Sequence, residues 1–246
     1  MSNQNWVFLR GLTRGNIHWG DFPQVLKKNN PDVKMELLEI PGNGELFQQK
    51  SPTNCLEVIK ILRASSQFCQ TKTPFNICGI SLGGMIALKW AELYPEELNS
   101  LVVINTSLKQ FSPFTHRLLP HNYFNIIKSL CISSCHKQEQ ILLEMTSNDE
   151  VAWKKKISHY TQYATTHTIS RKNFARQLLL AGNVFLEKIP LKVPTKIICS
   201  KNDRLVFHGC SAEIANKLAS KIYYHPTAGH DLPLDAPEWL AEMLLN

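Results

Sequence analysis

The sequence lacks the features that place a protein in a membrane or outside the cell. No apolar run approaches the roughly 20 residues that a membrane-spanning helix needs. The N-terminal segment, MSNQNWVFLR, contains neither the basic stretch nor the long apolar core of a secretory signal. The seven cysteines are odd in number and scattered, which is typical of reduced thiols and not of a disulfide framework. These absences predict a cytoplasmic protein that has no membrane partner.

The sequence also lacks signs of nucleic-acid binding, disorder or repetition. Aromatic residues do not interleave with the basic ones, and no nucleic-acid-binding motif is present, so we expect no nucleic-acid partner. No internal repeat or low-complexity tract interrupts the chain. Apolar residues make up 43% and charged residues 19%, which is ordinary for a globular protein. A chain of 246 residues is long enough to fold as one α/β unit with a sizeable core.

Positive charge, by contrast, is concentrated in one part of the chain. Residues 108–190 contain eleven Lys and Arg against five Asp and Glu, so they carry about +6 of the net charge of +7. Such an excess is typical of a solvated cationic surface. It is also the pattern expected of a surface that attracts an anionic substrate or an acidic carrier protein.

Short apolar segments alternate with helical patterns along most of the chain. Strands are predicted at residues 6–10, 35–40, 75–80, 98–105, 195–200 and 221–225. Helices are predicted at residues 22–28, 83–93 and 237–245, and another after a cap at Ser51. This alternation is typical of an α/β protein with a mostly parallel sheet of about six strands and helices on both faces.

The alternation stops between residues 108 and 190. Only helix-period patterning is present there, in about four segments, and Asn148 and Ser170 are good N-cap residues for two of them. A helical block between two strands of one sheet indicates an insertion and not a second domain. We therefore expect residues 1–107 and 191–246 to form the core, and residues 108–190 to form an inserted helical lid.

The strongest local signal is the segment Gly79-Ile80-Ser81-Leu82-Gly83-Gly84. It follows a predicted strand and begins a predicted helix, which is the context in which G-x-S-x-G forms a nucleophile turn. Glycines on both sides of the serine permit the tight turn that lifts its hydroxyl above the sheet. The helix N-terminus there favours developing negative charge. Ser81 is therefore the predicted nucleophile.

A serine nucleophile needs a base, and the base needs a carboxylate that orients it. In α/β-hydrolases the chain order is serine, acid, histidine. Asp203 follows the predicted strand at residues 195–200, and His230 lies in the loop after the last predicted strand. Ser81, Asp203 and His230 are accordingly the predicted catalytic residues.

Four nearby residues compete with the acid and base positions. Asp231 and Asp235 lie too close in sequence to His230 to occupy the end of the preceding strand. His225 falls within a predicted strand, and His208 lies at the start of a helix after Asp203. A weaker pattern, Cys131-x-x-x-Cys135-His136, has no second ligand pair at zinc spacing and predicts thiols on helices, not a metal site.

These motifs together resemble a known group of enzymes over nearly the whole chain. The matching segments are Gly11 with Trp19 eight residues later, Pro41-Gly42-Asn43-Gly44, GISLGG at residues 79–84, residues 99–103, NDRLV at residues 202–206, and AGH at residues 228–230. In this order and spacing they are similar to small α/β-hydrolases grouped with the pimeloyl-acyl-carrier-protein methyl ester carboxylesterase of biotin synthesis. The resemblance implies the α/β-hydrolase fold, with no metal and no cofactor.

The resemblance also implies an oxyanion hole made by two backbone N–H groups, here those of Leu12 and Leu82. The group usually has His-Gly before the first of these positions, whereas this chain has Arg10-Gly11, with Arg14 in the same loop. Guanidinium groups near the site could bind a carboxylate or phosphate, or pair within the protein. Arg10, Arg14 and Trp19 are the predicted substrate-binding residues.

The expected activity is that of a serine hydrolase that cleaves a small to medium carboxylic ester through an acyl-enzyme. A thioesterase or a C–C lyase on the same scaffold is an alternative, because a fold does not fix its chemistry. A second alternative is a ligand-binding pseudo-hydrolase with slow turnover. The sequence carries no signal for the oligomeric state or for the acyl and alcohol groups of the substrate.

Overall fold

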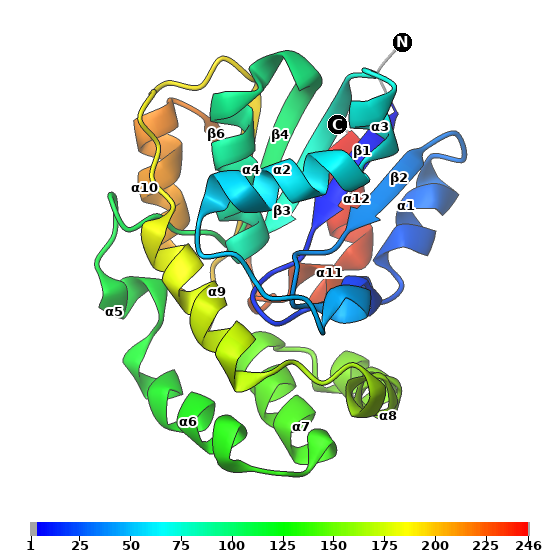
Figure 1. The fold of residues 1–246 in the computed structure, drawn as a ribbon, viewed down its shortest axis with the longest axis vertical. Helices are drawn as coiled ribbons and strands as arrows, with labels where there is room; N and C mark the ends of the chain where they lie inside the picture. The colour runs from blue at the N-terminus through cyan, green and yellow to red at the C-terminus, as the bar shows by residue number, and fades with distance from the viewer. Residues whose placement is uncertain (1–3, 246) are drawn as a thin grey trace.

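A computed structural model describes residues 4–245 of the chain (Figure 1). Its centre is a single six-stranded sheet in which every neighbouring pair of strands is parallel, in the order β2-β1-β3-β4-β5-β6. The strands are β1 Asn5–Leu9, β2 Lys34–Leu38, β3 Phe75–Ile80, β4 Leu98–Ile104, β5 Thr195–Ser200 and β6 Lys221–His225. The predicted fold class is confirmed, and each predicted strand differs from the observed one by two residues or fewer at either end.

The sheet is buried because helices cover both of its faces. All six residues of β3 are buried, which explains why this strand is a continuous apolar run without alternation. On β1, Val7 and Leu9 pack in one core cluster, whereas Trp6 and Phe8 pack in the other. This division follows the period of two in a strand, by which successive side chains point to opposite faces.

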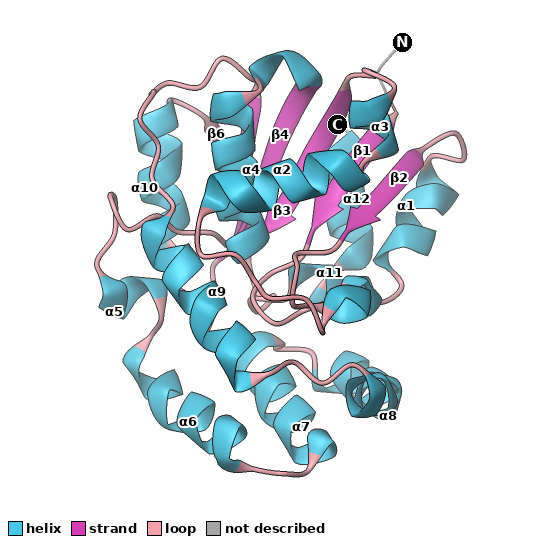
Figure 2. Ribbon diagram, viewed as in Figure 1, coloured by secondary structure: helices cyan, strands magenta, loops and turns pink. Residues whose placement is uncertain are grey.

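Two groups of helices make the layers on either side of the sheet (Figure 2). The first core cluster includes side chains of α2 Cys55–Ser65, α4 Leu82–Leu93 and α10 Gly209–Leu218. The second includes side chains of α1 Phe22–Asn29 and α12 Pro237–Leu245, which pack against each other. Two short α-helices outside the insertion are α3 Gln67–Gln70 and α11 Leu232–Asp235. Within residues 4–245, no helix is both long enough and apolar enough to cross a membrane.

The start of α2 corrects one expectation from the sequence. The helix begins after Asn54, whose side chain accepts hydrogen bonds from the backbone N–H groups of Leu56 and Glu57. Ser51, the predicted cap, is fully buried and donates its hydroxyl hydrogen to the carbonyl oxygen of Pro41 at 2.7 Å. Ser51 therefore fixes the loop that follows β2 and does not start the helix.

Helices α5 to α9 are inserted between β4 and β5, and they gather beyond one end of the sheet, green to yellow in Figure 1. They are α5 Phe114–Arg117, α6 Tyr123–Cys131, α7 Cys135–Thr146, α8 Glu150–Thr166 and α9 Arg171–Asn183. Ser170 caps α9 as predicted, whereas α8 is capped by Asp149, one residue after the predicted Asn148. A small apolar cluster that includes Tyr160 and Leu234 attaches α7 and α8 to α11 of the core.

The cap of α2 gives a stability prediction. Asn54→Ala should lower the free energy of unfolding by about 1 kcal/mol, because two N–H groups of the first helical turn lose their acceptor. Urea unfolding followed by circular dichroism measures the loss. Thr53→Ala, one residue earlier and outside the cap, is the matched control. Equal stability of the two variants would show that Asn54 does not determine where the helix starts.

Candidate active site

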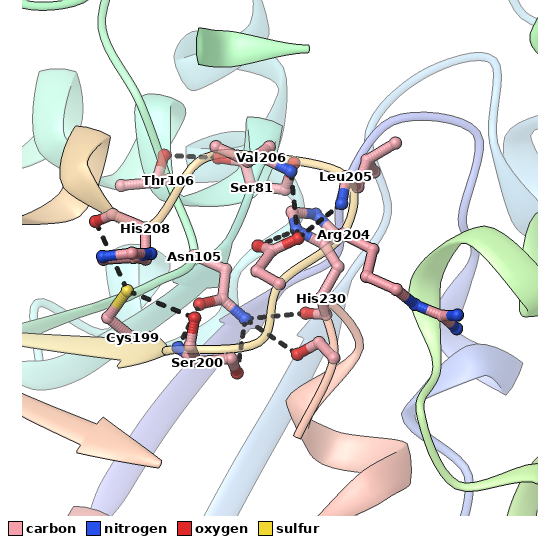
Figure 3. Close-up of polar contacts among 12 residues, drawn as sticks. Ser81, Asn105, Thr106, Cys199, Ser200, Arg204, Leu205, Val206, His208 and His230 are labelled. Atoms are coloured by element: carbon pink, nitrogen blue, oxygen red, sulfur yellow. Dashed lines mark hydrogen bonds and ion pairs between the residues drawn. The ribbon is translucent and has the colours of Figure 1, made fainter. Parts of the chain in front are cut away.

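Ser81 lies in a strained turn at the carboxyl end of β3, directly before α4. Its backbone has φ 55° and ψ −119°, a conformation that residues other than glycine seldom adopt. A Cβ on Gly79 would lie 2.3 Å from the Gly83 carbonyl oxygen, and one on Gly83 would lie 2.3 Å from the Leu9 carbonyl oxygen. Both positions therefore require glycine. The Thr106 hydroxyl donates to the Ser81 carbonyl oxygen at 2.7 Å and holds the turn against the end of β4 (Figure 3).

Asp203 and His230 are joined by a buried hydrogen bond. The distance from His230 Nδ1 to Asp203 Oδ2 is 2.7 Å, and both side chains are buried. The other carboxylate oxygen, Oδ1, accepts from the backbone N–H groups of Leu205 and Val206 at 2.8 and 2.9 Å. A carboxylate can only accept, so Nδ1 carries the imidazole proton and Nε2 is left as the acceptor. The structure thus brings these two predicted residues together in the geometry of an oriented base.

Asn105, which sequence reasoning did not single out, fixes the relative positions of these elements. It follows β4 with a positive φ of 45°. Its side-chain oxygen accepts from the Ser200 N–H at 2.7 Å, and its side-chain nitrogen donates to the His230 carbonyl oxygen at 2.9 Å (Figure 3). One amide therefore connects the ends of β4 and β5 to the loop that carries His230. An Asn directly after a buried strand was the available signal.

Two further contacts hold the His230 loop from the other side. The Gly229 N–H donates to Asp235 Oδ2 at 2.7 Å, and the Asp231 N–H donates to the carbonyl oxygen of Thr146 at 2.7 Å. Asp235 also accepts from Ser147 Oγ at 2.5 Å, and burial raises the pKa of this carboxyl group. Thr146 and Ser147 belong to the end of α7 and the turn after it, so the inserted helices contact the loop directly.

Asp231 forms a buried ion pair with Arg10 at the end of β1. The guanidinium donates to both carboxylate oxygens, at 2.9 and 2.8 Å, and both side chains are 4% exposed. The rival aspartates therefore have other partners: Asp231 pairs with Arg10, and Asp235 accepts from the backbone of the His230 loop. Of the rival histidines, His225 accepts at Nδ1 from the Ala228 N–H, and the ring of His208 lies 4.6 Å from the ring of Phe207.

The three residues predicted to bind substrate lie in different surroundings. Arg10 and Arg14 both line the cavity described below, but Arg14 is paired with Glu139 of α7 at 2.5 Å, as Arg10 is with Asp231. Trp19 is 1% exposed and packs in the second core cluster, with the Arg10 guanidinium 5.0 Å from the centre of its ring. Trp19 is therefore a core residue, as expected for a large apolar ring, and its contact with this site is with the Arg10 guanidinium.

A cavity of about 270 Å³ lies between the sheet edge and the inserted helices, and Ser81 and His230 both line it. Leu12 and Leu82, the two predicted oxyanion-hole residues, line it as well. Leu82 is the first residue of α4, where backbone N–H groups have no acceptor within the helix. Most of the remaining wall is apolar, with side chains from the core and from the insertion: Ile80, Met85, Phe114, Leu118, Ile126, Leu142, Met145, Phe174, Leu178, Leu205 and Val206.

The titratable side chains do not gather into a recognisable metal site. No group of three or more His, Cys, Asp or Glu residues close enough to hold a metal ion occurs in the part of the chain that the structure describes. Burial raises the pKa of the Cys78 and Cys199 thiols far above the usual value, so these thiols are protonated at neutral pH. The polar side chains that line the cavity include Ser81, His230, Arg10, Arg14 and Arg117.

Comparison with known proteins places the chain among hydrolases. The family model described as "Serine aminopeptidase, S33" matches residues 55–237. The human protein named monoacylglycerol lipase ABHD6 is 22% identical over 263 aligned positions, which cover 98% of this chain and 74% of that protein. The pimeloyl-[acyl-carrier protein] methyl ester esterase of Wigglesworthia glossinidia brevipalpis is 27% identical over a shorter stretch, covering 42% of this chain and 36% of that protein.

Solved structures agree with the fold. MGS-M2, an α/β-hydrolase enzyme from a deep-sea metagenome library of the Medee basin, superposes with a TM-score of 0.75 at 21% identity. The alignment covers 100% of this chain and 89% of that one. At this level of identity the likeness establishes the arrangement of the sheet and helices and not the substrate.

The buried Arg10–Asp231 pair gives a prediction about stability. Asp231→Asn should lower the free energy of unfolding by about 3 kcal/mol, because it leaves the Arg10 charge buried without its counter-ion. The double variant Arg10→Met with Asp231→Asn should recover much of that loss, since no unpaired charge is left. Urea unfolding of the single and double variants measures both effects. A double variant less stable than Asp231→Asn would contradict this account.

Proposed function

The chain belongs to the hydrolase family described as serine aminopeptidase S33, within the α/β-hydrolase superfamily, and on that premise we propose that it cleaves carboxylic esters with Ser81 as the nucleophile. The observation that carries the proposal is the pairing of His230 with Asp203 on the wall of the cavity that Ser81 also lines. A serine at a strained turn, an oriented imidazole and a buried carboxylate are together the requirements of acyl transfer.

The proposed reaction begins with attack of Ser81 Oγ on the carbonyl carbon of the ester. His230 Nε2 accepts the hydroxyl proton and returns it to the departing alcohol, while Asp203 stabilises the imidazolium. The N–H groups of Leu12 and Leu82 donate to the oxyanion of the tetrahedral intermediate. Water then attacks the acyl-enzyme with the same base, which releases the acid and restores Ser81.

The cavity favours an ester with an aliphatic acyl chain as the substrate. Its apolar wall matches an aliphatic acyl chain. The relatives that are similar to this chain, named as a monoacylglycerol lipase and a methyl ester esterase, both act on carboxylic esters by name. In this proposal residues 108–190 form a lid over the core of residues 1–107 and 191–246, because α7 and α9 supply much of the cavity wall opposite Ser81.

A second candidate is an ester that is anionic or is borne on an acidic carrier. The excess positive charge of residues 108–190 favours it, since a basic surface speeds the encounter with acidic partners. In the cavity, Arg10 and Arg14 are each already neutralised by a carboxylate, and the third arginine of the wall, Arg117, donates to Ser107 Oγ and to the Ala181 carbonyl oxygen. We place the neutral ester first because both arginines of the loop after β1 are paired.

Replacement of the nucleophile tests the proposal directly. Ser81→Ala should lower kcat on p-nitrophenyl octanoate by several orders of magnitude and abolish labelling by a fluorophosphonate probe. Ser107→Ala is the matched control, because Ser107 lines the same cavity and should not alter the labelling. Retention of more than about a tenth of wild-type activity in Ser81→Ala would remove the nucleophile assignment.

The proposed role of Asp203 is tested by replacing it with asparagine, which has nearly the same shape but no charge. Asp203→Asn should lower kcat about 10⁴-fold, because an amide stabilises the wrong tautomer of His230 and cannot stabilise the imidazolium. Asp149→Asn, which retains a cap for α8 outside the cavity, should leave kcat unchanged. Steady-state kinetics on p-nitrophenyl octanoate provide the measurement, and near-normal turnover by Asp203→Asn would mean that another group orients His230.

A further inference from the structure

The loop that follows β1, residues 10–15, lies directly against the proposed nucleophile. A Cβ atom on Gly11 would lie 3.2 Å from Ser81 Cβ and 3.7 Å from Ser81 Oγ. Leu12 and Thr13 line the same cavity as Ser81. The backbone of this loop is therefore beside Ser81, as the proposed oxyanion donor, the Leu12 N–H, requires.

The loop contains a backbone conformation that is unfavourable in isolation. Thr13 has a φ of 58°, in the left-handed region that β-branched residues rarely adopt. Such a conformation costs on the order of 1–3 kcal/mol and persists only where surrounding contacts hold it. The Thr13 N–H donates to Gln177 Oε1 at 2.9 Å, and Gln177 belongs to α9 of the insertion. An inserted helix therefore holds the strained residue of this loop.

A second set of contacts acts on the peptide group that contains the Leu12 N–H. The carbonyl oxygen of that group belongs to Gly11, and it accepts from Asn43 Nδ2 at 3.4 Å and from the Arg14 N–H at 3.3 Å. Both distances are at the long end of the hydrogen-bond range, so each contact alone is weak. A trans peptide group is planar, with its C=O and N–H on opposite sides. Contacts that hold the Gly11 carbonyl therefore also fix the direction of the Leu12 N–H.

Gln177 also orients Asn43. Its Nε2 donates to Asn43 Oδ1 at 2.6 Å and to Ser51 Oγ at 3.1 Å. Asn43 Nδ2 is thereby turned toward the carbonyl oxygens of the loop, including that of Arg14 at 3.2 Å. The loop N–H that Gln177 accepts from can only donate, and the loop carbonyls can only accept. The contacts at the two ends therefore determine which way both amides face.

The burial of these two amides separates their role from substrate binding. Gln177 and Asn43 are both 0% exposed, and neither lines the cavity that contains Ser81. A buried polar network whose members are hydrogen-bonded holds one arrangement rigidly. An effect of Gln177 on catalysis must therefore act through the loop and not through contact with the ester.

We propose that Gln177 is a positioning residue for the oxyanion hole: with Asn43, it holds residues 10–15 so that the Leu12 N–H points to the Ser81 site. The inference rests on the proposed esterase function, which it extends to a residue of the insertion. It gives α9 a role in the rate of the reaction, because the oxyanion donor is in place only while α9 is docked on the loop.

Gln177→Met tests the inference, because methionine has nearly the same length and cannot make these hydrogen bonds. On p-nitrophenyl octanoate we expect kcat to fall by between about tenfold and a hundredfold, less than the outright loss of an oxyanion donor costs. KM should change less than about twofold, because the contact with the oxyanion is made in the transition state. Titration with a fluorophosphonate probe counts the active sites, so that kcat is expressed per folded molecule.

A transition-state analogue gives a readout that a merely structural role would not change. Ser81 Oγ adds to the carbonyl carbon of heptyl trifluoromethyl ketone, His230 takes the hydroxyl proton, and the carbonyl oxygen becomes the oxyanion of the adduct. The affinity for this ketone should fall in Gln177→Met by the same factor as kcat/KM. Octanamide, whose carbonyl stays planar, should bind the variant as it binds the wild-type protein.

Asn173→Leu is the matched control. Asn173 is another buried amide of α9, and it bonds to the Ser51 N–H and to two carbonyl oxygens of the loop after β2. Its side chain therefore makes as many hydrogen bonds to the core as that of Gln177, but none of them is to residues 10–15. This variant should also lose stability, but its kcat should stay within about twofold of the wild-type value.

Asn43→Ala is a second variant, on the core side of the same contact. It should lower kcat and leave KM unchanged, because the Gly11 carbonyl loses a donor, and it decides the question if Gln177→Met does not fold. A wild-type kcat in Gln177→Met, an equal fall of kcat in Asn173→Leu, or an unchanged affinity for the ketone would each overturn the inference. Absence of turnover and of fluorophosphonate labelling in the wild-type protein would instead overturn the esterase function itself.

Discussion

The buried pair between Arg10 and Asp231 joins two segments that must be held in register for the proposed chemistry. Arg10 directly follows β1, two residues before the Leu12 N–H of the proposed oxyanion hole, and Asp231 follows the proposed base His230. A bidentate guanidinium–carboxylate contact fixes orientation as well as distance. The two residues are 221 positions apart in sequence, so this contact helps to fix the loop of His230 relative to the loop that carries Leu12.

The parallel sheet explains why a few contacts are enough to position the residues of the candidate site. All six strands run in the same direction, so the residues that follow them meet at one edge. Arg10, Ser81, Asn105 and Asp203 come after β1, β3, β4 and β5, which are neighbours in the sheet. The loop with His230 follows β6 and is not part of any strand or helix. Hydrogen bonds hold this loop instead. The His230 carbonyl oxygen accepts from Asn105, and the N–H groups of the residues on either side of His230 donate to Asp235 and to Thr146.

Sequence reasoning singles out residues that have a local signature, but it does not find contacts that depend on distant partners. The turn at Ser81 is encoded within six residues, and steric contacts at Gly79 and Gly83 explain why the motif is specific. Asn105 and Asp231 have no such signature, because their partners lie about a hundred residues or more away. Strand positions were predicted well because an apolar run is a local feature of the sequence. Ser51 was misassigned because its burial depends on distant contacts, with Pro41 and with Gln177 of the insertion.

The net charge of the insertion, counted along the sequence, differs from the charge that its residues place beside the cavity. Residues 108–190 carry a clear excess of positive charge, yet the insertion also contributes a buried carboxylate, Glu139, which pairs with Arg14 on the wall of the cavity that Ser81 lines. Long basic side chains keep their charges in water and are screened within about 8 Å at physiological salt. Glu139 is buried, and its pairing with Arg14 acts at the distance of a hydrogen bond. The exposed charge therefore acts on molecules in solution, whereas the buried pair adds no net charge to the cavity wall.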